Sequence, residues 1–541
     1  MTVMTGAEAL AISLKQNNVD TIFGLPGVQL DHFFDALYKE RDSLRLIHTR
    51  HEQGAAYMAF GYSQSTGRVG TCTVVPGPGL LNTGGALCTA HGCGAAVLCV
   101  TGQIPSRFIG KGYGMLHEIA DQMRTMSSMT KWQGCADKPT EGPRLIRDAF
   151  EQLNTGRRRP VMVEMPPDIM AREADIELLD PVKEYVEPEP DPDLIDKAAA
   201  LLGNAKNPGI FVGGGIFGAE EELLQLAETL QAPVFMSSHG LGAVDGRHYL
   251  AQNMLAGAEL WPKIDVALAV GTRFVMPMLH WGYDDDIKLI RIDPDAAQSV
   301  APWKPDVHIV TTGKLALGAL VDRTARHNRK RDSREADLNA LKMRLAKNLD
   351  EHLTPQAEYA RVIRNGLSED GIACFGVTQL GFYAWWNFPV YKPRTMIQPG
   401  YQGTLGYGFP TSLGAKVANP DKMVVGVVGD GGFMFNVQEL ATAALHNIKS
   451  VTVVFNDNAF GNVRRTQKNA YGGRIIGSDL KNPDFMKLAD SFGVMGIRAD
   501  SPEKLRSALN EAFKADAPAL IEVPIRELPE WQKFMPMQKI R

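Results

Sequence analysis

Two acidic side chains stand at the ends of two apolar runs in the last third of the chain. Asp430 follows "MVVGVV" and is flanked by Gly429, Gly431 and Gly432, whereas Asp457 comes directly after "SVTVVFN". Apolar runs that end in glycine or asparagine are typical of buried parallel strands, and the carboxyl ends of such strands meet at one edge of a sheet. We therefore expect the two carboxylates to lie close together.

The residues around this acid pair predict a site for a divalent cation bound to phosphate. Glycines at a strand end expose backbone N–H groups, and the N-terminus of a following helix adds positive potential, so residues 429–432 can cradle phosphate oxygens. An acid in such a cradle repels phosphate unless a cation lies between them. Asp430, Asp457 and the backbone carbonyl of Ala459 supply the oxygen ligands that Mg²⁺ prefers. Taken singly, the first segment is only a turn and the second only a helix cap, but the pair favours the cation.

A third acidic residue, Glu52, lies near the other end of the chain in "RHEQGAAYMAFGY". It precedes a helix that is made mostly of small residues, and such a helix is expected to be buried. A glutamate at the start of a buried helix must pair with a polar group or stay protonated. We predict a catalytic role for Glu52, and an ion pair with Arg50 is the alternative.

The segments "GDGG" and "NDN", separated by one helix and one strand, resemble the diphosphate motif of thiamine diphosphate (ThDP) enzymes. The branch that they resemble holds acetolactate synthases, benzoylformate decarboxylases and pyruvate-decarboxylase-like proteins, and the likeness extends over nearly the whole chain. It implies that Mg²⁺ joins the diphosphate to Asp430, Asp457 and the Ala459 carbonyl. The family usually has Asn where this chain has Asp457, which adds a negative charge to the site.

The resemblance also implies roles for residues around the cofactor. In "IQPGYQGTLGYGF" the Gly403 carbonyl is expected to accept from the 4′-amino group of the pyrimidine, and Leu405 is expected to bend the cofactor into a V shape. Glu52 is expected to hydrogen-bond N1′ of the pyrimidine and so to promote loss of the thiazolium C2 proton. Four residues of "FGVTQL" align with a segment that touches the diphosphate: Val377, Thr378, Gln379 and Leu380.

The cofactor supplies the electron sink, while the protein selects the substrate and its fate. Segments such as "PGPGLLN" and "SSHGLGAVDG" are similar to acetolactate synthases, but "GMLHE" puts Leu116 and His117 where synthases usually have Phe and Gln. The serine and the histidine of benzoylformate decarboxylases align with Val28 and Val75. We therefore predict an apolar substrate pocket with four members: Val28, Val75, Leu116 and Phe460.

These substitutions favour a decarboxylase. We expect ThDP- and Mg²⁺-dependent, non-oxidative decarboxylation of a 2-oxo acid with an apolar or aromatic side chain, with carboligation as a side activity and His117 as a candidate for proton transfer. The alternative is an acetolactate synthase-like carboligase. A dinucleotide-dependent oxidoreductase is disfavoured because "FVGGGIFGAEE" lacks the G-x-G-x-x-G spacing. Bound FAD stays open as a further cofactor, with its absence favoured.

The segments that must position these residues form three blocks. Each block alternates short apolar runs that end in Gly or Pro with helical periods, which predicts three α/β domains with doubly wound parallel sheets. The expected boundaries are residues 1–183 for a pyrimidine-binding domain, 191–335 for a middle domain and 357–541 for a diphosphate-binding domain. The Pro- and acid-rich residues 184–193 read as a linker, and residues 323–353 as one long connecting helix.

Composition and charge disfavour several other classes of protein. The 541-residue chain has a net charge of −4, so no nucleic-acid partner is expected, and the basic run at residues 323–334 reads as a solvated segment. Six cysteines without a C-x-x-C pair indicate reduced thiols in a cytoplasmic protein. No apolar run approaches the roughly 20 residues that span a bilayer. The resemblance implies a homo-oligomer, at least a dimer and by expectation a tetramer, with sites between subunits.

Overall fold

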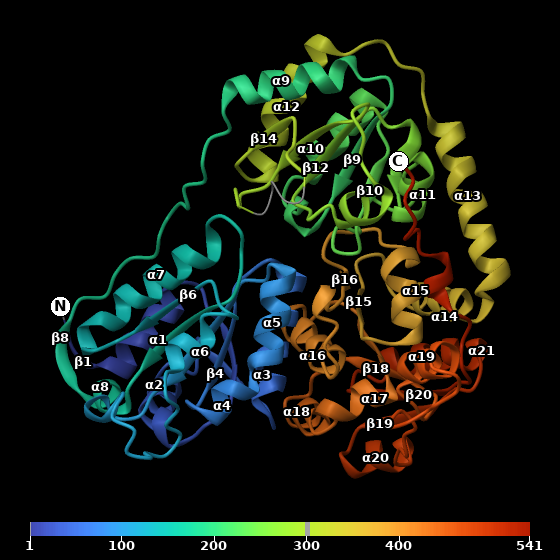
Figure 1. Ribbon diagram of the computed structural model, residues 1–541. Coiled ribbons are helices and arrows are strands. Elements are labelled where there is room, and N and C mark those ends of the chain that lie inside the picture. Colours follow the sequence, from blue (N-terminus) through green and yellow to red (C-terminus); the bar gives the residue numbers. More distant parts are fainter. Residues whose placement is uncertain (1, 298–302) are drawn as a thin grey trace. The chain divides into compact units, whose positions relative to one another are not determined.

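The computed structural model describes residues 2–297 and 303–541 (Figure 1). The chain divides into two compact units. The first unit contains Met1–Val186, Ile372–Thr378 and Pro399–Pro524, and the second contains Glu187–Gly371, Gln379–Gln398 and Ile525–Arg541. Neither unit is a single stretch of sequence, because the chain passes between them several times.

The first unit holds two parallel sheets in which five strands follow the same order. The N-terminal sheet has the order β3-β2-β4-β5-β7-β6, and the C-terminal sheet contains the order β15-β17-β18-β20-β19. The strands of the N-terminal sheet are β2 (Thr21–Gly24), β3 (Arg45–His48), β4 (Gly70–Val74), β5 (Val97–Gly102), β6 (Trp132–Cys135) and β7 (Val161–Met165). The strands of the C-terminal sheet in this unit are β15 (Ile372–Phe375), β17 (Val424–Gly429), β18 (Val451–Asn456), β19 (Met495–Arg498) and β20 (Ala519–Pro524). A separate antiparallel pair joins β1 (Thr2–Thr5) to β8 (Glu173–Ile176).

Helices cover both sheets, and two of them meet through small residues. Helix α3 (Glu52–Thr66) packs against α16 (Gly408–Ala418) (Figure 1). A side chain at Gly61 would clash with the carbonyl of Thr411, and one at Gly414 would clash with the carbonyl of Met58. The small residues of these helices therefore allow the two backbones to approach closely.

The remaining helices of the first unit follow the strands in the alternating pattern of an α/β fold. Those of its N-terminal part are α1 (Gly6–Gln16), α2 (Asp31–Lys39), α4 (Pro78–Asn82), α5 (Gly84–Cys93), α6 (Gln122–Met126), α7 (Gly142–Asn154) and α8 (Pro167–Ala171). Those of its C-terminal part are α17 (Asp430–Phe433), α18 (Glu439–Leu445), α19 (Gly461–Ala470), α20 (Phe485–Ser491) and α21 (Pro502–Lys514).

The second unit holds the middle sheet, with the strand order β11-β10-β9-β12-β13-β14, as in doubly wound dinucleotide-binding folds. Its strands are β9 (Pro208–Val212), β10 (Val234–Met236), β11 (Ala251–Gln252), β12 (Val266–Val270), β13 (Lys288–Ile292) and β14 (Val307–Ile309), and the short β16 (Met396–Ile397) also belongs to this unit. Its helices are α9 (Pro192–Asn204), α10 (Glu220–Leu230), α11 (Met254–Leu260), α12 (Gly313–His327), α13 (Glu335–His352), α14 (Thr354–Asn365) and α15 (Gln379–Asn387). Three parallel sheets with flanking helices confirm the predicted α/β class.

The prediction of one long helix over residues 323–353 is wrong. The segment contains the end of α12, a break at residues 328–334, and α13. In the break, the guanidinium of Arg331 donates to the carbonyls of Leu202, Gly203 and Ala205. The basic run therefore holds the break against the end of α9, which a continuous helix would not allow.

The glycine run of "FVGGGIFG" has a packing role. A side chain at Gly213 would lie 2.5 Å from the carbonyl oxygen of Gly271, and one at Gly215 would lie 2.7 Å from the Gly271 Cα. These two glycines let the turns that follow β9 and β12 approach closely. Across the described residues, no helix combines the length and the apolar character needed to cross a membrane.

Candidate cofactor site

The structure brings the predicted acid pair together at the end of the C-terminal sheet. Strands β17 and β18 pair in parallel with Gly429 opposite Phe455, so Asp430 and Asp457 leave the same edge of the sheet. Asp430 is 2% exposed and begins α17. Burial raises the pKa of Asp430, while hydrogen bonds from Asn482, from backbone N–H groups and with the Asp457 carboxyl act in the opposite direction. The buried carboxyl group of Asp430 thus meets the half-buried carboxyl group of Asp457.

Asn482 lies among the oxygens of this site, and the sequence analysis did not identify it. Its Nδ2 donates to Asp430 Oδ2 (2.6 Å), Asn456 Oδ1 (2.9 Å) and Asn458 Oδ1 (3.3 Å). The side-chain oxygens of Asp430, Asn456 and Asn458 thus point towards one place, and such a group of oxygens is stabilised by a positively charged partner. The donor set therefore fits a divalent cation. In sequence, Asn482 precedes a proline and signals only a turn.

Ala459 is held in place by a neighbouring segment. Its N–H donates to Asp457 Oδ1 (3.3 Å), and the residue forms an isolated antiparallel bridge with Asp479. Leu480 N–H donates to the Asn458 carbonyl (2.8 Å). Within residues 2–297 and 303–541, no cluster of three or more His, Cys, Asp or Glu side chains could hold a metal ion. A cation at this two-carboxylate site would therefore need further ligands, such as the diphosphate.

The glycines after Asp430 fall into two types. A side chain at Gly431 would lie 2.7 Å from the ring of Phe460, so the ring itself requires glycine there. At Gly432, the nearest atoms to an added Cβ are the Gly406 nitrogen and Leu405 Cδ2, both at 3.9 Å. The absent side chain of Gly432 leaves space beside Leu405 that a phosphate group can use, so the residues fit the diphosphate.

The other expected cofactor residues lie in two places. Gly403 is exposed, has a φ of +55° and has no atom within 4 Å of an added Cβ. Val377 and Thr378 follow β15, and Thr378 lies beside Gly429. Gln379 and Leu380 begin α15 in the second unit. Gln379 accepts from the Leu528 N–H (3.1 Å), and Leu380 is fully buried.

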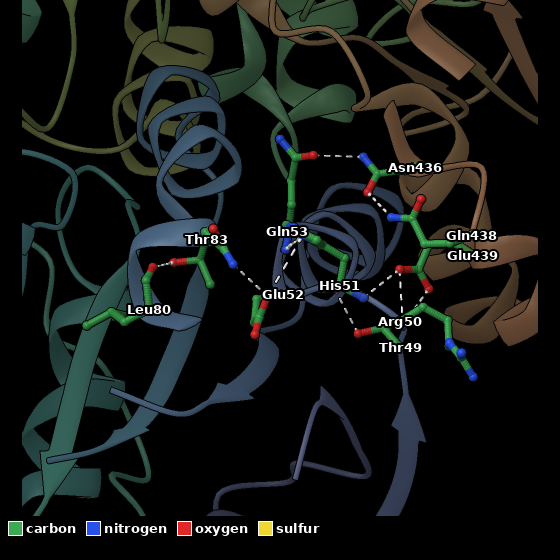
Figure 2. Close-up of polar contacts among 11 residues, drawn as sticks. Thr49, Arg50, His51, Glu52, Gln53, Leu80, Thr83, Asn436, Gln438 and Glu439 are labelled. Atoms are coloured by element: carbon green, nitrogen blue, oxygen red, sulfur yellow. Dashed lines mark hydrogen bonds and ion pairs between the residues drawn. The ribbon is translucent and has the colours of Figure 1, made fainter. Parts of the chain in front are cut away.

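Glu52 is the first residue of α3 (Figure 2). The preceding residue, His51, is the N-cap, and its Nδ1 accepts from the Gln53 N–H (3.1 Å). Glu52 Oε2 accepts from Asn82 Nδ2 (3.0 Å) and lies 3.9 Å from His51 Nδ1. The side chain of Glu52 thus lies at a helix N-terminus, where Asn82 orients it.

The four side chains of the predicted substrate pocket have different surroundings. Val75 is buried at the end of β4, next to the Glu52 side chain and Gly79. Val28 and Leu116 are 64% and 60% exposed. Phe460 packs on Gly431 at the other sheet. The described chain therefore places Val75 beside Glu52, whereas Val28 and Leu116 face solvent.

His117 lies in a strained turn next to the end of β4. Its φ is +68°, and its backbone leaves no room for a side chain at Gly77. Its Nδ1 lies 2.9 Å from Gln29 Oε1, while Gln29 Nε2 donates to the Leu116 carbonyl (2.9 Å). This amide orientation makes Nδ1 the donor, so the neutral ring carries its lone pair on Nε2.

A buried polar network holds this turn from behind. Gln122 Oε1 accepts from the Gly77 N–H (2.9 Å), and its Nε2 donates to Glu164 Oε2 (2.6 Å). Burial raises the pKa of Glu164, and the hydrogen bond from Gln122 acts against that rise. Gln103 Nε2 lies 3.4 Å from the other carboxylate oxygen. In the sequence, Glu164 is marked only as an isolated acid within the apolar run "VMVEM".

Comparison with known proteins identifies the class to which this fold and site belong. The models of the thiamine pyrophosphate enzyme family match at residues 4–125 (N-terminal TPP binding domain), 195–320 (central domain) and 376–523 (C-terminal TPP binding domain). The chain therefore belongs to the thiamine pyrophosphate enzyme family and is a ThDP-dependent enzyme.

Relatives with assigned activities cover nearly the whole chain. It is 34% identical to a probable acetolactate synthase large subunit of Methanococcus aeolicus, over 96% of this chain and 92% of that protein. It is 32% identical to an acetolactate synthase large subunit of Corynebacterium glutamicum, over 97% and 87%. It is also 30% identical to a probable 2-ketoarginine decarboxylase of Pseudomonas aeruginosa, over 96% and 94%.

Proposed function

We propose that the protein uses ThDP and Mg²⁺ to decarboxylate a 2-oxo acid and joins the remaining carbon unit to a second carbonyl compound. This is a carboligase activity of the acetolactate synthase type. It replaces the expectation of a benzoylformate-type decarboxylase, which the relatives do not support. The observation that carries the proposal is the similarity to acetolactate synthases over 96% of the chain, which includes the segments of both Glu52 and Asp430.

The residues present can be assigned to parts of the cofactor. Asp430, Asp457 and the Ala459 carbonyl would hold Mg²⁺, and the space left by the missing side chain of Gly432 would receive part of the diphosphate. Leu405, which borders that space, would pack against the cofactor. ThDP, when bound, supplies the electron sink for loss of CO₂.

Glu52 would hold a proton at N1′ of the pyrimidine. Asn82 Nδ2 orients one of its oxygens (3.0 Å). A positioned acid–base group typically contributes about 10²–10⁴ in rate. The buried apolar side chain of Val75 lies on the same side and can exclude water from the reacting atoms.

Carboligation requires that the carbon unit left after decarboxylation meet its acceptor before it meets a proton. Val28 and Val75 stand at the positions where the resembled benzoylformate decarboxylases carry a serine and a histidine, and a valine cannot donate a proton. Neither of these two positions therefore supplies a hydroxyl or imidazole proton donor, which favours ligation over simple protonation.

A second candidate is decarboxylation without ligation, which His117 favours. The hydrogen bond between His117 Nδ1 and Gln29 Oε1 fixes the ring and directs the lone pair of the neutral form to Nε2. A fixed imidazole is suited to proton transfer. The similarity to a probable 2-ketoarginine decarboxylase is consistent with this alternative.

Product analysis separates the two candidates. The protein, depleted of cofactor and then supplied with ThDP and Mg²⁺, would receive pyruvate, branched-chain 2-oxo acids, 2-ketoarginine and benzoylformate, each with and without a second carbonyl acceptor. Carbon dioxide and the carbon products would be measured by mass spectrometry. We expect CO₂ with a ligated hydroxy-ketone product, and we expect Glu52→Gln to lose both.

Three other outcomes are informative. Carbon dioxide with one equivalent of aldehyde would favour the second candidate, and His117→Gln should then shift the products towards ligation. No ThDP-dependent CO₂ from any acid, in protein shown to bind the cofactor, would contradict both candidates. A sedimentation measurement on the same preparation tests the proposed homo-oligomer, for which we expect at least a dimer.

A further inference from the structure

The segment that follows Asp430 contacts the segment that carries Glu52 on both sides of that residue. Glu439, the first residue of α18, reaches the backbone before Glu52, and Asn436 reaches the side chain after it (Figure 2). Both contacts lie within the first unit.

Glu439 accepts two backbone N–H groups of the turn before α3. Arg50 N–H lies 3.1 Å from both carboxylate oxygens, and His51 N–H donates to Oε1 at 3.0 Å. The hydroxyl of Thr442 donates to Oε2 (2.6 Å). Glu439 has no exposed surface, so these three donors are its replacement for water.

Two further features describe how the fold accommodates this acid. A side chain at Gly54 would lie 2.5 Å from Glu439 Oε1, so the glycine on the first turn of α3 makes room for the acid. Burial raises the pKa of Glu439 to about 7, and the hydrogen bonds from Thr442, Arg50 and His51 act against that rise. The fold therefore keeps a costly buried acid where an apolar residue of similar size could pack.

Asn436 provides the second contact. It is fully buried, and its Nδ2 donates to Gln53 Oε1 (2.9 Å) and to the Gly406 carbonyl (2.8 Å). Gly406 directly follows Leu405, which borders the space for the diphosphate. Asn436 thus links the residue after Glu52 to the loop of the same chain that contains Leu405.

We propose that Glu439 and Asn436 are positioning residues for Glu52. Glu439 acts through the backbone N–H groups of Arg50 and His51, and Asn436 acts through Gln53. Neither residue needs to touch substrate. The inference rests on the proposed role of Glu52. It matters for catalysis because a displacement of about 1 Å in a reacting group can cost about 100-fold in rate.

The test uses Glu439→Leu in the full-length protein. Leucine is of similar size but has no acceptor, so both backbone N–H groups would lose their partner. We expect kcat to fall about 10- to 100-fold, with KM and ThDP affinity within about threefold of the wild type. Gln53→Met, which removes the acceptor of Asn436 on a half-buried side chain, should lower kcat about three- to tenfold by the same logic.

A matched control is available on the same unit. Glu141 also accepts two backbone N–H groups, from Asp137 (2.8 Å) and Lys138 (3.3 Å), far along the chain from the site. Glu141→Leu should leave kcat unchanged. If Glu439→Leu lowers kcat only in proportion to a loss of folded protein, the role is structural and the proposal is wrong.

Hydrogen exchange of the cofactor-free protein gives a readout that needs no activity. In the wild type, the amides of Arg50 and His51 should exchange slowly, and Glu439→Leu should accelerate them at least about tenfold because both amides lose their acceptor. Unchanged exchange would overturn the proposal even if kcat fell. If the wild type shows no ThDP-dependent turnover but this acceleration occurs, the proposed function fails while the contact itself stands.

Discussion

The two sheets of the first unit carry different side chains at the carboxyl ends of their strands, although five strands follow the same order in both sheets. Each of these sets of strand ends is called an edge. Each sheet carries a buried glutamate on the corresponding strand, Glu164 on β7 and Glu522 on β20. Each glutamate faces a side-chain amide at the end of the neighbouring strand: Gln103 lies 3.4 Å from Glu164, and Asn456 donates to Glu522 at 2.8 Å. Both edges are therefore held from behind by the same kind of contact, between a buried glutamate and a side-chain amide.

The two sheets differ in the residue that follows one pair of corresponding strands, β4 in the N-terminal sheet and β17 in the C-terminal sheet. After β4 the chain continues with Val75, whereas after β17 it continues with Asp430. The same scaffold thus presents an apolar edge beside Glu52 and a charged edge suited to a cation. The comparison teaches that strand order decides where a site forms, while one or two side chains at the strand ends decide its chemistry.

The largest effect should come from removing the charge at the second edge. We expect Asp430→Asn to weaken ThDP binding in the presence of Mg²⁺ by at least about 100-fold, because a neutral amide is a poor ligand for a hard cation. Calorimetric titration of the cofactor measures this. The exposed Asp500→Asn, whose carboxylate pairs with Lys504, is the control, and equal affinity in Asp430→Asn would break the comparison.

The stability of the protein should depend on pH because of Glu439, the buried acid that contacts the turn before Glu52. Burial raises the pKa of Glu439 to about 7 from an ordinary 4.5, so the folded protein binds this proton more tightly than the unfolded chain does. The wild type should therefore lose stability relative to Glu439→Gln as pH rises from about 4.5 to about 7, by about 3 kcal/mol. Denaturant unfolding of both proteins at pH 5 and pH 8 measures the difference. A difference that does not change with pH would show that Glu439 titrates elsewhere.

Paired substitutions of the two supporting glutamates should sharpen the comparison. Glu522→Gln should weaken ThDP and Mg²⁺ binding about tenfold, because Asn456 then loses a charged partner behind the metal edge. Glu164→Gln should raise the KM for substrate about tenfold and leave cofactor affinity unchanged, because Gln122 and the Gly77 turn lose their anchor. If both variants changed cofactor affinity and substrate KM alike, the two edges would not have separate roles in cofactor and substrate binding.

The smallest effect should come from the exposed part of the apolar edge. Leu116 is 60% exposed, so Leu116→Ala should leave thermal stability within about 0.5 kcal/mol of the wild type. We expect a change of about two- to threefold in substrate KM, since little apolar area is lost. Steady-state kinetics with the preferred 2-oxo acid measure it. A loss of more than about tenfold would place Leu116 inside the substrate pocket.

Local sequence patterns were enough for the class of fold and for the expectation that Asp430 and Asp457 lie close together. Short apolar runs that end in glycine or asparagine identified the strands, and their order along the chain placed Asp430 near Asp457. The glycine-rich start of α3 likewise indicated a buried helix behind Glu52. Such signals are local, because each depends on residues within one or two turns of the chain.

Contacts between distant segments could not be predicted in this way. Glu439 and Arg50 are 389 residues apart, and nothing in "NVQELATAA" marks its glutamate as a partner for a backbone turn. Asn482 carries only a turn signal. The predicted long helix failed for the same reason, since Arg331 ends it through bonds to α9 that the local pattern does not contain.

The central claim is that Glu52 acts on a cofactor held by Asp430. The most direct test measures how fast the C2 proton of bound ThDP exchanges with D₂O, by rapid quench and NMR, in the wild type and in Glu52→Gln. The account predicts exchange that is slower by about 10²–10⁴ in the variant, with ThDP affinity within about threefold of the wild type. Equal exchange rates in the two proteins, each saturated with ThDP and Mg²⁺, would contradict it.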